Sequence, residues 1–158
     1  MKKKKIIRAG IITVVAGIVI AGAVVLYLFN MPHRDVQSAK SDFNLTSSQL
    51  VAEYLADAAA ANTKYLAADG DSKVLEVSGE VSKISENFDG QKVVLLKSAA
   101  DKAGVSASFL PETSANAEKL QVGQSVTIKG VIRSGAAYDD DLELYENVIL
   151  EKSDIVTK

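Results

Sequence analysis

The sequence predicts a mainly β domain with flanking helices that follows an apolar N-terminal segment. Ala9 to Phe29 contains 21 residues without a charge or a Pro, and short stretches of alternating apolar and polar residues begin near Lys73. Short antiparallel strands of this number predict a small barrel or sandwich. The chain contains no Cys, so the domain must be stabilised by packing without disulfides or thiolate metal sites.

The apolar run predicts a transmembrane helix over residues 9–29. A helix rises about 1.5 Å per residue, so this run spans about 30 Å, the thickness of the bilayer's hydrocarbon core. Basic residues at positions 2–5 and at Arg8 precede it, and positive flanks stay in the cytoplasm. We therefore expect a single-pass inner-membrane protein whose C-terminal domain faces the periplasm or the cell exterior. The predicted organisation is a cytoplasmic start (1–8), the membrane helix (9–29), a linker (30–45) and the outer domain (46–158).

Two further interpretations concern this segment. A cleaved signal peptide has the same basic start, but its apolar part is about 7–15 residues long and ends at small residues, whereas this run leads into Asn30 and Met31. A stripe of small residues every four positions would let two helices approach closely and permits a homodimer. The stripe consists of Ala9, Thr13, Gly17 and Ala21.

The linker opens with a polar collar, Pro32–Asp35, which contains His33, the single histidine of the chain. A metal site needs several convergent ligands. We therefore interpret His33 as an exposed residue at the membrane surface rather than as a ligand or a pH sensor.

An amphipathic helix is predicted from about Ser47 to Asn62. Thr46 and Gln49 have the spacing of a capping box, and Leu45 and Leu50 occupy the positions of a hydrophobic staple. Apolar residues then recur three or four positions apart, so one face of the helix is expected to pack on the domain.

Five strands with a helix between the third and the fourth are predicted after a turn at Asp69–Ser72. Gly79 in mid-strand suggests a bulge or bend, and Asp89–Gly90 closes a hairpin. The expected strands are 73–84, 91–97, 105–109, 125–133 and 142–152, with a helix at Ser114–Leu120 capped by Thr113 or Ser114, and a loop at 134–141.

This order is that of an OB-fold barrel, and several stretches also resemble one family. They are PHRD, NTKYL, KVLEVSGEVSKI, EKLQVGQSVTIKGVI and LELYENVIL. Together they resemble the OB-fold tRNA-anti-like family of membrane-anchored bacterial proteins over most of the chain beyond the anchor. The resemblance implies the five-stranded barrel. It does not imply a ligand, because one fold hosts many functions.

An OB-fold binds ligands on the face of its second and third strands and in two loops, between strands one and two and between strands four and five. The candidate contact residues in these loops are Phe88, Tyr138, Asp139, Asp140 and Asp141. Residues 73–158 carry ten Lys and Arg against fourteen Asp and Glu, a net charge of −4. This charge opposes a polyanion and disfavours nucleic acid, although the two aromatic residues could stack on bases.

The sequence carries no recognisable catalytic or metal-binding pattern. The run Asp139–Asp141 could hold calcium or a basic partner, but calcium loops space their ligands alternately. A solvated charged turn is the better interpretation of this run and of Asp69 and Asp71. The domain has no histidine to activate a serine, no cysteine and no phosphate-binding loop. We therefore expect no enzymatic activity, no cofactor and no metal.

The sequence thus predicts a membrane-tethered, non-catalytic binding module whose partner is an envelope protein, a glycan or a small ligand. A structural or interaction protein of the envelope without a small ligand is the alternative. A nucleic-acid-binding domain is a third possibility that the acidic charge disfavours.

Overall fold

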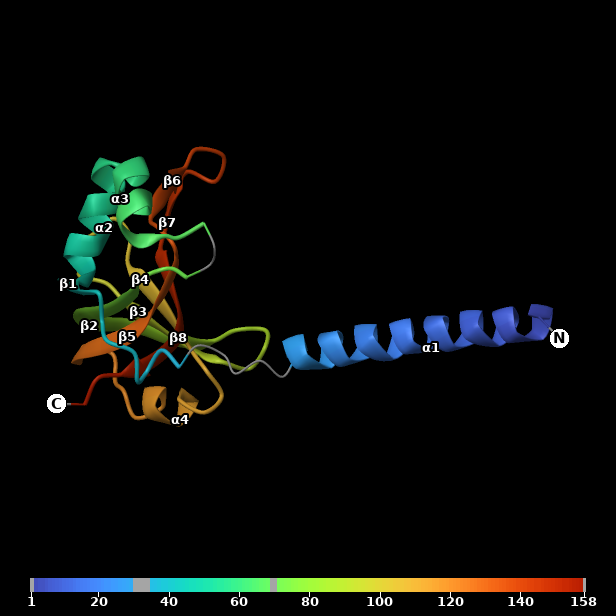
Figure 1. Cartoon of the computed structure of the whole chain (residues 1–158). Helices are drawn as coiled ribbons and strands as arrows, with labels where there is room; N and C mark the ends of the chain where they lie inside the picture. The colour runs from blue at the N-terminus through green and yellow to red at the C-terminus, as the bar shows by residue number, and fades with distance from the viewer. Residues whose placement is uncertain (1, 30–34, 69–70, 158) are drawn as a thin grey trace. The chain divides into compact units, whose positions relative to one another are not determined.

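The computed structural model describes residues 2–29, 35–68 and 71–157, which form two compact units, Met1–Asp35 and Val36–Lys158 (Figure 1). Two predicted features fall at least partly outside the described residues. They are the collar, of which residues 32–34 with His33 are not described, and the turn after the amphipathic helix, of which residues 69–70 are not described.

The first unit contains the helix α1 (Lys2–Phe29), which includes the predicted membrane segment. Its side chains are described from residue 14 to residue 27, and the large apolar ones, from Val14 to Tyr27, are each at least 50% exposed. Within the described part of the chain, no helix meets both the length and the hydropathy required to span a bilayer. The membrane span therefore stays a prediction.

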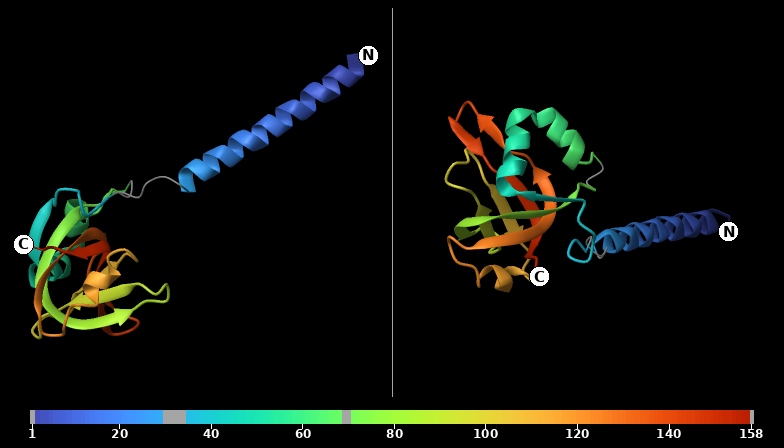
Figure 2. Two further views of the ribbon diagram at one scale, coloured as in Figure 1. Left: turned by 90° about the horizontal axis from the view of Figure 1, so that it is seen from below. Right: turned by 90° about the vertical axis from the view of Figure 1, so that its left-hand side faces the viewer.

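The second unit is built on a closed five-stranded barrel (Figure 2). The barrel strands follow the order β2-β3-β4-β8-β5, and the pairing of β2 with β5 closes the ring. β4 and β8 are parallel, and the other neighbours in the ring are antiparallel. The strands are β2 (Val74–Glu86), β3 (Lys92–Leu96), β4 (Val105–Phe109), β5 (Ser125–Ser134) and β8 (Val148–Ile155). This confirms the predicted five-stranded barrel.

Further elements surround the barrel. β1 (Phe43–Thr46) pairs in parallel with β2, and α2 (Ser47–Ala56) and α3 (Ala58–Tyr65) follow it. The short helix α4 (Ser114–Ala117) lies between β4 and β5, and β6 (Ala137–Asp139) and β7 (Leu144–Glu146) form a separate two-stranded sheet. The short strands β1 and β6 were not predicted from the sequence.

The prediction of one continuous amphipathic helix was wrong, because the helix is interrupted at Asp57. This residue has extended backbone angles, and its N–H donates to the Glu53 carbonyl at 3.1 Å, which ends α2. Its side chain then accepts a hydrogen bond from the Ala60 N–H at 3.0 Å and caps α3. One aspartate therefore ends the first helix and starts the second.

The later strands also differ in detail from the prediction. The expected fifth strand is divided at Asn147, whose Oδ1 accepts a hydrogen bond from the Gly104 N–H at 2.7 Å. The register shift of β2 lies between Val81 and Lys83 rather than at Gly79. Gly79 is required for a different reason, because a Cβ there would lie 2.7 Å from the Ser47 Oγ.

The helix α4 is shorter than predicted, and the side chain of its N-cap residue, Thr113, makes no capping bond. The Thr113 hydroxyl instead donates to the Ser153 carbonyl at 2.7 Å and so links the start of α4 to β8.

The barrel interior is filled by side chains that alternate along the strands, as the sequence predicts. Phe109, Leu96, Ile128, Ile132 and Leu150 are completely buried. Leu50 and Tyr54 of α2 join the same core, so the two helices are packed against the barrel wall.

The capping box of α2 is formed as predicted. The Thr46 Oγ1 accepts from the Gln49 N–H at 3.1 Å, and the Gln49 side chain accepts from the Thr46 N–H at 2.9 Å. We expect Thr46→Ala to lower the free energy of unfolding by about 1 kcal/mol, the usual value of an N-cap. Urea unfolding measures this, and Thr46→Ser, which keeps the acceptor, should restore most of the loss. Equal stability of Thr46→Ala and wild type would contradict it.

Candidate ligand-binding site

The most prominent feature outside the barrel is a short arm, residues 135–146, that contains β6 and β7 and rises beside α2 and α3 (Figure 1). Tyr138 and Tyr145 are opposite each other in its ladder, with ring centroids 4.8 Å apart. Tyr138 is 47% exposed, and Tyr145 is half-buried. The arm therefore presents a pair of aromatic rings, one of which is open to solvent.

The acidic run forms the turn at the tip of this arm. The Asp139 Oδ1 accepts hydrogen bonds from the N–H groups of Asp141 and Leu142, each at 2.9 Å. Asp140 and Asp141 are exposed. Among the residues that the structure describes, no three His, Cys, Asp or Glu side chains are grouped in a way that could hold a metal ion. One carboxylate of the run thus stabilises the turn.

A cavity of about 370 Å³ lies between α2, α3 and the arm, and we call it the tyrosine cavity. Its walls are mostly apolar or aromatic. Of the described residues that line the cavity, Lys102 alone is charged. The Lys102 Nζ lies 5.4 Å from the centroid of the Tyr145 ring, a cation–π contact. The lining residues are Tyr54, Leu55, Ala58, Lys102, Ala136, Ala137, Tyr138 and Tyr145.

Tyr54 lines this cavity, and its hydroxyl is buried. The residue is 2% exposed, and its Oη has no hydrogen-bond partner among the described residues. Burial, with smaller contributions from the nearby Tyr65 and Glu53, raises the pKa of Tyr54 to about 12. The ring lies directly over Gly135, since a Cβ at Gly135 would be 1.9 Å from the Tyr54 Cε1.

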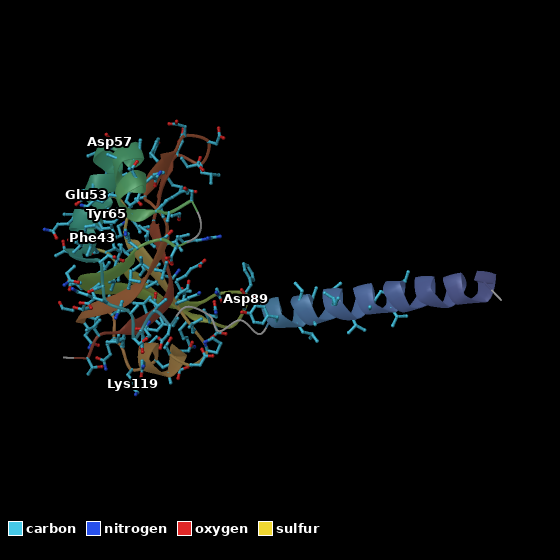
Figure 3. All side chains as sticks on the ribbon, viewed as in Figure 1. Phe43, Glu53, Asp57, Tyr65, Asp89 and Lys119 are labelled. Carbon is cyan, nitrogen blue, oxygen red and sulfur yellow. The ribbon has the colours of Figure 1, made fainter. Side chains whose placement is uncertain are left out.

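Tyr54 packs in a network on α2 and α3, of which Figure 3 labels Glu53 and Tyr65. The Tyr54 ring stacks on Tyr65 with centroids 6.0 Å apart, and the Tyr65 hydroxyl donates to the Glu53 Oε2 at 2.7 Å. The Lys64 Nζ also donates to Glu53 at 2.8 Å and lies 5.2 Å from the centroid of the Phe43 ring. The hydrogen bond from Lys64, followed by that from Tyr65, lowers the pKa of Glu53.

This network predicts a modest acid sensitivity. The pKa of Glu53 is lower in the folded protein than in the unfolded chain, where it is near 4.5. The ionised side chain therefore stabilises the folded state above about pH 4.5, and this stabilisation is lost as the pH falls through the pKa of the folded state. Both side chains are partly exposed, so the contribution should be about 0.2–1 kcal/mol. We expect Glu53→Gln to be less stable than wild type at pH 7 by this amount and to match it near pH 2. A constant difference in urea unfolding across this pH range would exclude the ion pair as the cause.

Phe88, the other predicted aromatic contact, lies in the turn between β2 and β3 and is fully exposed. The turn is held by Asn87, whose Oδ1 accepts from the N–H groups of Asp89 at 3.1 Å and Gln91 at 2.9 Å. Asp89 is far from the arm in Figure 3. Phe88 lines neither the tyrosine cavity nor a second, larger groove beside the N-terminus of α2. The structure therefore separates Phe88 from Tyr138.

A second cavity is a shallow groove of about 620 Å³ beside the N-terminus of α2. Its lining is rich in hydroxyl groups, and two of them, the Ser78 Oγ and the Thr127 Oγ1, are hydrogen-bonded to each other at 2.7 Å. The hydroxyl residues are Thr46, Ser47, Ser48, Ser78, Ser98, Ser125, Thr127 and Thr157. None of the described residues that line this groove is aromatic, which distinguishes it from the tyrosine cavity.

The outer face of β3 and β4, where an OB barrel usually binds, is unlike a nucleic-acid platform. Its outward-facing positions are Val93, Leu95, Ser106 and Ser108, and the half-exposed Lys92 at the start of β3 pairs with Glu86 at 2.9 Å. Single strands are bound by basic grooves with stacked aromatic side chains, and none of the four outward-facing residues is basic or aromatic.

Comparison with known proteins agrees with this architecture. The profile of the family described as tRNA_anti-like matches residues 1–143. The chain belongs to the tRNA_anti-like family. Its barrel is similar to the crystal structure of a proposed nucleic acid-binding lipoprotein from Klebsiella pneumoniae, with 21% identity and a TM-score of 0.53 over 80% of this chain and 100% of that chain. At this identity the similarity shows the fold of the tRNA_anti-like domain. A search of curated proteins finds no match.

Of the eight residues that line the tyrosine cavity in this tRNA_anti-like protein, Tyr138 alone was predicted as a site residue, and the aromatic or charged residues that were missed are Tyr54, Lys102 and Tyr145. Tyr54 lies on the apolar face of a helix, and its spacing predicts only a packing role. Tyr145 was assigned to a barrel strand. Lys102 follows a chain break and carries no motif, so the sequence alone gives no signal for it.

Proposed function

We propose that this tRNA_anti-like protein is a non-catalytic binding module, tethered to the membrane by residues 9–29 with its barrel in the periplasm or cell exterior. The observation that carries the binding role is the tyrosine cavity. It combines apolar and aromatic walls with a few polar groups, which is the usual character of a ligand pocket.

The proposal of a tether rests on the apolar run and on the exposure of α1. The large apolar side chains from Val14 to Tyr27 are exposed around the helix. A helix that is hydrophobic on all sides is favoured within a protein core or a bilayer. The five basic residues before the run orient it with the N-terminus inside.

A pull-down from membranes tests the binding role. Full-length protein and Tyr138→Ala would be compared for co-purifying proteins, glycans and small molecules, with Phe88→Ala as the matched exposed aromatic outside the cavity. We expect Tyr138→Ala to lose one reproducible component that wild type and Phe88→Ala both retain. If Tyr138→Ala retains every component, the cavity is not the binding site.

A protease-protection assay tests the orientation independently. In intact spheroplasts, an external protease should digest the barrel and leave the N-terminal basic segment protected. Protection of the barrel until the membrane is opened would reverse the proposed topology.

Nucleic-acid binding is a second candidate, motivated by the exposed rings of Phe88 and Tyr138. The acidic residues beside both rings and the net charge of −4 over residues 73–158 disfavour it. A salt-dependent mobility shift of single-stranded RNA by the full-length protein, abolished by Tyr138→Ala, would establish it in place of the envelope ligand. A structural protein of the envelope without a ligand would show neither the RNA mobility shift nor the loss of a co-purifying component from Tyr138→Ala.

A further inference from the structure

We propose that the tyrosine cavity binds a planar aromatic carboxylate, which stacks on Tyr138 and pairs with Lys102. This inference rests on the proposed binding function and specifies its ligand class. The cavity of about 370 Å³ is at the lower end of the range of ligand pockets, about 300–1000 Å³, so it suits a ligand of one or two rings rather than a polymer.

The aromatic component follows from the two facing tyrosines. Tyr138 is 47% exposed and its ring centroid is 4.8 Å from that of Tyr145, so about half of Tyr138 remains accessible to a flat ligand. Offset stacking of aromatic rings stabilises such a contact beyond the burial of area. The remaining walls, from Leu55, Ala58 and Ala136, are apolar and would enclose the ring edges.

The negative charge of the ligand follows from Lys102. No carboxylate among the described residues lies within 4 Å of the Lys102 Nζ, although other lysines of the domain have such partners. Lys102 is exposed and also lines the mostly apolar cavity, so its ammonium is accessible to an anion bound there. The carboxylates at the tip of the arm do not line the cavity, and Asp139 is engaged with the turn.

The hydroxyl of Tyr54 supplies the third element. It is buried without a hydrogen-bond partner among the described residues, an arrangement that is costly unless another group completes it. An oxygen of the carboxylate is a suitable acceptor. The hydroxyl is closed off from solvent in this structure, so an outward movement of the arm is required for the ligand to reach it.

Fluorine NMR with three matched probes tests this inference on the full-length protein in a non-ionic detergent. The probes are para-fluorobenzoate, para-fluorobenzamide and para-fluorobenzylamine, which have similar size and different charge. Detergent without protein corrects for partitioning. We expect the benzoate to bind at least about threefold more tightly than the neutral benzamide, and the benzylamine to bind most weakly.

Four variants locate the interactions. Lys102→Met should reduce benzoate affinity to that of benzamide, whereas Lys83→Met, an exposed lysine on β2 outside the cavity, should leave both affinities unchanged. Tyr138→Leu should weaken both probes about tenfold by removing the stacking ring. Tyr54→Phe should weaken both about fivefold without lowering thermal stability, a combination that a purely structural role would not produce.

The outcomes separate this inference from the function on which it rests. Equal binding of benzoate and benzamide, or a Lys102→Met variant that still prefers benzoate, would overturn the carboxylate class and leave the cavity as a binding site. Failure of all three probes, or binding that Tyr138→Leu does not change, would overturn the inference. The binding function itself is then decided by the membrane pull-down.

Discussion

Gly135→Ala should destabilise the domain by roughly 2–3 kcal/mol, at the upper end of the usual cost of overpacking. The added methyl group would lie 1.9 Å from the Tyr54 Cε1 and 2.0 Å from its Cδ1. A buried ring that stacks on Tyr65 cannot move aside without disturbing the packing of α2 on the barrel. The midpoint of urea unfolding should therefore fall with little change in slope.

A double-mutant cycle identifies the cause of this loss. In a Tyr54→Ala background the ring is absent, so Gly135→Ala should cost much less than in wild type. If the two losses simply add, the contact between the ring and the glycine is not responsible. The Gly135→Ala variant should also close or distort the tyrosine cavity, because the displaced Tyr54 lines that cavity.

Alkaline pH should destabilise the protein through Tyr54. The pKa of Tyr54 is about 12 in the folded state, whereas the ordinary pKa of a tyrosine is 10.0. The hydroxyl is therefore neutral in both states below pH 10, and its full contribution to stability is present there. The contribution is lost as the pH rises from 10 through 12, because the unfolded chain ionises first. A difference of about two pH units corresponds to roughly 2–3 kcal/mol for a buried group.

Tyr54→Phe is the matched control for this loss. It keeps the ring and removes the ionisable hydroxyl, so its stability should fall less than that of wild type between pH 10 and pH 12. At pH 7 it should be at least as stable as wild type, since the hydroxyl is buried without a partner among the described residues. Parallel stability curves for the two proteins across this range would show that Tyr54 does not titrate as described.

The barrel was predictable because its signals are local. Val105, Ala107 and Phe109 alternate with serines, and the structure buries these three in the interior. Thr46 and Gln49 similarly place the start of α2. Asp57 was missed because the apolar period continues through it, although an aspartate before a run of alanines is also a cap signal. β1 has four residues and is defined by its pairing with β2, about 30 residues later, which no local pattern reveals.

The candidate site was less predictable for a related reason. Tyr138 and the adjacent carboxylates were assigned to a ligand loop, and the structure places them on an ordered arm. The cavity beside the arm depends on Tyr54 and Lys102, which are separated from Tyr138 by 84 and 36 positions. The packing of α2 against the arm brings these residues together, and that packing depends on the whole fold.

The location of the aromatic groups distinguishes this domain from an OB-fold that binds single strands. The outward-facing Val93, Leu95, Ser106 and Ser108 are aliphatic or hydroxylic, and the two paired tyrosines, with rings tilted by 53°, lie on the arm that connects β5 to β8. Membership of the tRNA_anti-like family therefore defines the barrel, whereas the proposed ligand depends on elements added around it.

The most direct test of the central claim is photo-crosslinking in intact cells from a photoreactive phenylalanine analogue placed at position 138. The same analogue at position 88 serves as the control, since both positions are exposed and aromatic. Mass spectrometry of the intact chain would detect a protein, glycan or small molecule. We expect one reproducible adduct from position 138 that is absent from position 88. Adducts from position 88 alone, or none from position 138, would contradict a binding site at the tyrosine cavity.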